Sequence, residues 1–90
     1  MIEANTLDRI AEATLTGGPS ESTVQGLREA WSGLHFSYCM DDDISGPKPV
    51  REMPGIRLYL VDGREHCLRL TEDLAVATGV VVAEVEDDDD

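Results

Sequence analysis

The sequence predicts an α+β fold in which two N-terminal helices pack on one face of a small antiparallel sheet of about four strands. Three observations predict it. Apolar residues recur at helical spacing before residue 33, they alternate with polar residues after it, and Asp62-Gly63 is a strong turn signal between two apolar runs. Because 90 residues suffice for one small domain, we expect a single domain over residues 1–86 and a disordered acidic tail over residues 87–90.

The first third of the chain is predicted to form two short helices. Asn5 or Thr6 is placed to cap the first helix, and Gly17-Gly18-Pro19 ends it. Ser20 opens the second helix, which ends at Ser32-Gly33. Each helix has one apolar stripe, formed by Leu7, Ile10, Ala11 and Leu15 in the first and by Val24, Leu27 and Trp31 in the second. We expect the helices to cover the sheet.

The rest of the chain is predicted to form the sheet. Residues 34–40 alternate apolar and polar side chains, as a half-buried strand does, and residues 41–55 form a long loop. A hairpin follows over residues 56–70, Thr71 caps a single helical turn, and residues 79–85 form the last strand.

The length of the hairpin turn decides which side chains share a face of the sheet. A two-residue turn at Asp62-Gly63 would scatter the apolar residues over both faces, whereas a three-residue loop with a left-handed Gly63 gathers them. We therefore predict the three-residue loop. It puts Ile56, Leu58, Leu60, His66, Leu68 and Leu70 under the helices, and it puts Arg57, Tyr59, Val61, Cys67 and Arg69 on the outer face, where we also place Val80 and Val82.

The charge of the chain excludes some classes of partner. With 19 acidic and 7 basic residues, the net charge of −12 repels nucleic acids and anionic membrane surfaces. The N-terminal residues lack the basic flank and apolar centre of a secretory signal, so we expect a cytoplasmic protein. Both cysteines should then be reduced thiols.

His35, Cys39, His66 and Cys67 have the residue types of a structural zinc site. Their faces argue against one, because His66 and Cys67 are neighbours in a strand and point to opposite sides of the sheet. His35 and Cys39 are also too far apart along a strand to form a catalytic pair. The sequence therefore predicts no cofactor and no enzyme.

The loop after the first predicted strand resembles a calcium-binding loop in its spacing. Asp41, Asp43, Ser45 and Glu52 fall at positions one, three, five and twelve of an EF-hand loop, with Gly46 at position six. A strand rather than a helix leads into it, and Lys48 occupies the position where an apolar residue is expected. The alternative is an exposed acidic loop without a metal ion.

The outer face of the sheet is a candidate partner-binding surface. It is less polar than a solvated face should be, and the loop beside it carries the apolar Ile44. We expect the partner to contact Tyr59, Val61, Arg57, Cys67 and Ile44. The alternative of equal weight is that the loop itself covers this face.

Three segments, "LHFSYCMDDDI", "LYLVDGREHCL" and "ATGVVVAEVE", resemble an uncharacterised family of short acidic bacterial proteins associated with nitrogen-fixation gene clusters. The resemblance covers residues 34–86 except the loop, and it carries no catalytic residues. It implies a non-enzymatic accessory protein that binds nitrogenase or its cofactor-assembly machinery. The alternative is a carrier of a divalent metal or a cofactor, which would use the acidic loop at residues 41–52 or the Cys and His residues.

Overall fold

Two helices, one 3-10 turn and five strands make up the part of the chain described by the computed structural model, residues 2–44, 48–63 and 69–85. The elements are α1 (Ala4–Gly17), α2 (Glu21–Ala30), β1 (His35–Met40), η1 (Asp41–Asp43), β2 (Arg51–Met53), β3 (Ile56–Asp62), β4 (Arg69–Thr71) and β5 (Gly79–Glu84). The predicted α+β class is confirmed. Within these ranges, neither helix has the length and apolar character needed to cross a membrane.

The two helices form where the sequence predicts them. Ser20 is the N-cap of α2, and its hydroxyl accepts a hydrogen bond from the Thr23 N–H at 3.2 Å. The first helix begins earlier than expected, at Ala4, and ends where Gly18 takes a positive φ of 83°. Leu15 was expected in the buried stripe but is 50% exposed. Thr14 is buried instead, and its hydroxyl donates to the Ile10 carbonyl, so its polar group is satisfied.

The sheet is mixed, with the strand order β1-β5-β3-β2 and with β4 also paired to β3. It has one strand more than the four expected, and β1 and β5 are parallel, whereas all other pairs are antiparallel. Because β5 occupies one edge of β3 from Ile56 to Val61, β2 and β4 share the other edge. The extra strand is β2, which lies in the segment predicted to be loop and turns into β3 at Gly55, where φ is 78°.

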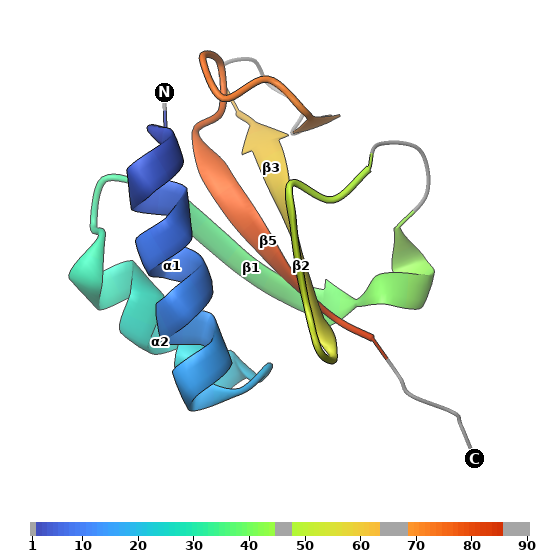
Figure 1. Cartoon of the computed structure of the whole chain (residues 1–90). Helices are drawn as coiled ribbons and strands as arrows, with labels where there is room; N and C mark the ends of the chain where they lie inside the picture. Colours follow the sequence, from blue (N-terminus) through green and yellow to red (C-terminus); the bar gives the residue numbers. More distant parts are fainter. Residues whose placement is uncertain (1, 45–47, 64–68, 86–90) are drawn as a thin grey trace.

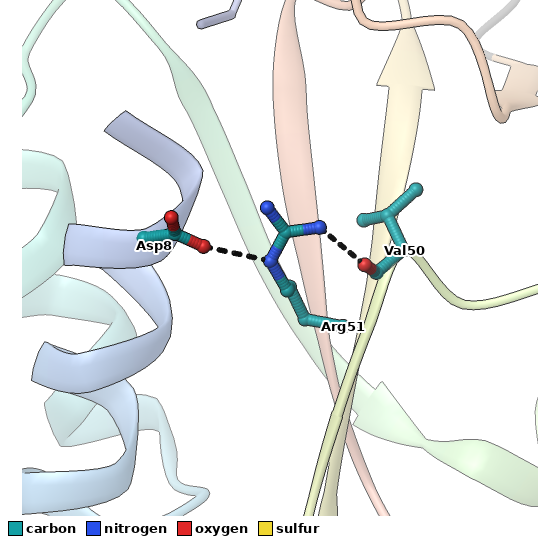
Figure 2. A network of polar contacts seen from close by, with 3 residues as sticks. All are labelled: Asp8, Val50 and Arg51. Atoms are coloured by element: carbon teal, nitrogen blue, oxygen red, sulfur yellow. Dashed lines mark hydrogen bonds and ion pairs between the residues drawn. The ribbon is translucent and has the colours of Figure 1, made fainter. Parts of the chain in front are cut away.

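Polar contacts join the helices to strands at both edges of the sheet. Figure 2 shows Arg51 of β2 between α1 and its own strand: its Nε lies 2.9 Å from Asp8 Oδ1, and its NH1 donates to the Val50 carbonyl. At the opposite edge, Arg28 of α2 donates two hydrogen bonds to the Phe36 carbonyl of β1, at 3.2 and 3.0 Å. The guanidinium occupies part of the open edge of β1.

The main core lies between the helices and one face of the sheet (Figure 1). The helices contribute Leu7, Ile10, Ala11, Val24 and Leu27, and the strands contribute Phe36, Ile56, Leu58, Leu60, Val80 and Val82. The placement of Val80 and Val82 on the outer face is therefore wrong. Because β5 pairs with β3, Val80 lies opposite Leu60 and Val82 opposite Leu58, and each pair shares a face.

The predicted three-residue hairpin loop is also wrong. Six residues, 63–68, separate the paired Asp62 and Arg69, and the next pair is Val61 with Leu70. Leu70 therefore lies on the outer face, and Arg69 lies on the other one, the reverse of the expectation. His66, Cys67 and Leu68 lie outside the described residues. After β4, a hydrogen-bonded turn at residues 74–76 replaces the expected helical turn, and Asp73 Oδ1 accepts the Ala75 N–H there.

Candidate functional site on the outer face of the sheet

The face of the sheet opposite the helices carries a second, smaller apolar cluster. Its buried members are Tyr59 and Val61 of β3 and Val81 and Ala83 of β5, and we call them the outer cluster. They lie on one face because Tyr59 pairs with Val81, and Ala83 lies two residues further along β5. Cys39, Ile44 and Leu70 are half-buried and pack against them. The two central strands are thus buried on both faces.

The expectation that Tyr59 and Val61 form an exposed patch is wrong. Tyr59 is 4% exposed and Val61 is 6% exposed. The alternative, that the chain covers its own outer face after β1, agrees with the packing of Ile44 against the outer cluster. Contact of these residues with a partner stays a prediction. It requires either that the covering segment moves away or that the partner binds to the residues at its border.

A carboxylate joins this cover to the central strand. Asp41, the first residue of η1, accepts a hydrogen bond from the Tyr59 hydroxyl on Oδ1 at 2.7 Å and lies 2.9 Å from Arg57 NH1 through Oδ2. Arg57 and Tyr59 are two residues apart in β3, so both side chains point to the outer face. We call these three residues the Asp41 clamp. The sequence pattern places all three near the outer face but does not show that they touch.

The contacts with Asp41 raise the pKa values of Tyr59 and Arg57. Burial raises the pKa of the Tyr59 hydroxyl, and the hydrogen bond to Asp41 raises it further because it is made only by the protonated form. The negative charge of Asp41 raises the pKa of Arg57. Both shifts favour the protonated forms, a neutral phenol and a guanidinium cation, and these are the forms that donate hydrogen bonds to Asp41.

A second tyrosine and carboxylate pair joins β1 to β5. The Tyr38 hydroxyl donates to Glu84, and this hydrogen bond is the largest of the effects that raise the pKa of Tyr38. The two strands are parallel and in register, with Met40 opposite Glu84. Their C-terminal ends therefore lie at the same end of the sheet.

This parallel pairing creates an acidic end of the sheet that the sequence pattern does not reveal. The Asp41–Asp43 turn follows β1 directly, and Glu84 ends β5 at the same level. After Val85 the sequence adds five further acidic residues, Glu86 to Asp90. Finding this feature from the sequence would require knowing that β1 and β5 are neighbours with the same direction. The acidic end borders the outer cluster through Asp41.

The residues of the predicted calcium loop are only partly described. Asp41 uses both carboxylate oxygens in the clamp, and Glu52 is exposed on β2 opposite Arg57. Ser45 and the side chain of Asp43 lie outside the described residues. Among the described residues, no group of three or more His, Cys, Asp or Glu side chains could hold a metal ion. The calcium loop stays a prediction.

The predicted Cys and His residues are likewise only partly described. His35 is exposed and Cys39 is half-buried, and they lie four residues apart in β1. Both side chains belong to the outer face, since His35 pairs with Gly79 and Cys39 with Ala83. Their predicted partners, His66 and Cys67, lie outside the described ranges.

Fold and site together define a small acidic α+β domain with helices on one face of a mixed sheet and a self-covered apolar cluster on the other. The chain belongs to a family of unknown function, DUF6129, whose family model matches residues 5–85. No curated protein and no solved structure matches the chain.

Proposed function

We propose that this chain is a non-enzymatic accessory protein that binds a larger protein through the outer face and the acidic end of its sheet. The observation that carries the proposal is the position of the outer cluster directly beside the acidic end, with Asp41 belonging to both. Apolar residues bordered by charge are typical of protein interfaces. The partner that fits this surface has an apolar centre and a basic rim.

The exposed and half-buried residues around the outer cluster are the ones that a partner reaches first. Ser37 and His35 are exposed on β1, and Ile44 and Leu70 are half-buried over the outer cluster. The net charge of −12 attracts a basic partner and makes the encounter sensitive to salt.

The resemblance of residues 34–86 to proteins associated with nitrogen-fixation gene clusters narrows the choice of partner. The candidates are a nitrogenase component or a protein of its cofactor-assembly machinery, in the cytoplasm of a nitrogen-fixing bacterium. The alternative of a metal or cofactor carrier has less support, since Asp41, its first proposed ligand, is already engaged by Tyr59 and Arg57.

The experiment is affinity capture from an extract of nitrogen-fixing cells, with recovered proteins identified by mass spectrometry. The baits are the wild type, Ser37→Arg, and Ser22→Arg as the matched control. Both serines are exposed, but Ser37 lies on the outer face opposite Val81, whereas Ser22 lies in the first turns of α2. Each substitution adds the same bulk and the same charge, so that only the position differs.

We expect the wild type and Ser22→Arg to recover nitrogenase components or their assembly proteins. Ser37→Arg should recover at least about 90% less, which corresponds to a loss of about 1.4 kcal/mol of binding free energy. A bait truncated after Glu86 should recover the same proteins in smaller amounts, because it has lost four negative charges. Equal recovery by both arginine variants would overturn the proposed surface. Recovery of none of these proteins by any bait would overturn the proposed partner.

A further inference from the structure

We propose that residues 41–44 form a displaceable strap over the outer cluster, fastened by the Asp41 clamp, and that the partner binds the outer cluster after the strap lifts. The inference rests on the proposed function, because it names how access to the same surface is controlled. It explains how an aromatic that is 4% exposed can belong to an interface.

Within the described part of the chain, Asp41 and Ile44 are the strap residues that contact the outer face. Asp41 contributes the hydrogen bond from Tyr59 and the ion pair with Arg57, and Ile44 contributes apolar contact with the outer cluster. The Ile44 N–H binds the Asp41 carbonyl at 3.0 Å, so the polar and apolar contacts belong to one small turn. A lost clamp would therefore free both kinds of contact together.

The sheet beneath the strap does not depend on it. The ladder between β1 and β5 ends at Met40, one residue before the strap begins. Tyr59 and Val81 are held by the ladder between β3 and β5, which runs from Ile56 to Val61. The strap can thus lift without breaking a pair of the sheet, and such local openings need less free energy than global unfolding.

The ion pair that fastens the strap is partly exposed to solvent and can open readily. Arg57 is the more exposed partner of the ion pair, with 39% of its side chain accessible, and partly exposed ion pairs contribute little stability in water.

The test uses a buried thiol as a reporter and needs no partner. In a chain carrying Cys39→Ser and Cys67→Ser, Val81→Cys places a single thiol in the outer cluster, where Val81 is 8% exposed. Its reaction with a disulfide reagent is followed in the presence of Asp41→Ala or of Asp42→Ala. Asp42 is the exposed neighbour in the same turn, so Asp42→Ala is the matched control for the loss of one charge.

We expect Asp41→Ala to raise the labelling rate about tenfold, since a hydrogen bond to a charged group and an ion pair are lost, and Asp42→Ala to change it less than about twofold. Global unfolding is followed in parallel by the fluorescence of Trp31, which packs on the main core on the other side of the sheet. Strap opening exposes little surface, so the labelling rate should depend only weakly on low urea concentrations.

Equal labelling of the two variants would overturn the strap, and so would a labelling rate that rises with urea as steeply as global unfolding does. Binding to a partner obtained by capture supplies the second arm: Asp41→Ala should bind more tightly than Asp42→Ala, because both have lost one charge but only one has lost the clamp. If Asp41→Ala is labelled faster but capture recovers no expected partner, the strap is supported and the proposed partner is rejected. The two proposals can therefore fail separately.

Discussion

Asp41 is the residue at which the outer face is fastened, because its two oxygens bind different side chains of β3. Tyr59 is one of these two side chains. Its pKa is raised by burial and then by the hydrogen bond to Asp41, so the folded chain holds the phenolic proton more tightly than the unfolded chain does.

This shift predicts a loss of stability in alkali. The contribution of Tyr59 is fully present below the unfolded pKa of about 10 and is lost as the pH rises through the higher folded value. As the pH rises above about 10, we expect the free energy of unfolding to fall more steeply in the wild type than in Tyr59→Phe. Urea titrations at several pH values measure it. A difference in free energy between the two chains that stays constant up to pH of about 11 would contradict the assignment.

At this scale the sequence pattern selects Asp41, Arg57, Tyr59 and Ile44 as candidate residues, but it does not predict that Asp41 contacts Tyr59 and Arg57. The reason is that the clamp joins residues 16 and 18 positions apart in the chain. Local patterns give the face of a strand residue, but they do not say which loop crosses that face.

At the scale of elements, the parallel pairing of β1 with β5 is the feature that positions the site, and Gly79 permits it. A Cβ atom built on Gly79 would lie 2.4 Å from the His35 carbonyl oxygen and 2.7 Å from His35 Cβ. No side chain fits between these backbones without moving the strands apart. The first pair of the ladder between β1 and β5 is His35 with Gly79, so the register begins at this contact.

Gly79→Ala should therefore destabilise the chain by about 2 kcal/mol, as an overpacked position does. Gly26→Ala is the control, because a Cβ on Gly26 meets no atom within 4 Å and lies in the middle of α2. We expect this control to stabilise the chain by about 0.5–1 kcal/mol through helix propensity. Thermal or urea unfolding measures both. Similar changes in the two variants would show that β1 and β5 do not approach as closely as described.

Elements with local signals were predictable from the sequence, and those defined by distant pairing were not. The Ser20 cap and the helical spacing located α2, and the alternation of residues 34–40 located β1. Alternation has no direction, so it could not show that β1 and β5 are parallel. The three residues of β2 are too few to display a period, and the six-residue connection between β3 and β4 reversed the faces of Leu70 and Arg69.

For the whole molecule, the two faces of the mixed sheet carry different features. Helices and sheet enclose the main core on one side, and the other side brings the outer cluster and the acidic end together. The composition shows that the chain is acidic, whereas the concentration of charge at one end of the sheet depends on strand order. Binding should accordingly be local to the outer face and weaken with salt.

Site-specific photo-crosslinking in nitrogen-fixing cells shows whether a partner contacts the outer face of the sheet. A photoreactive amino acid replaces Ser37 on the outer face or, in a second chain, Ser22 on α2, two exposed positions on different elements. We expect a crosslink from position 37 to a nitrogenase component or assembly protein with a basic surface, and none from position 22. Crosslinks to such a protein from position 22 alone, or from neither position, would contradict it.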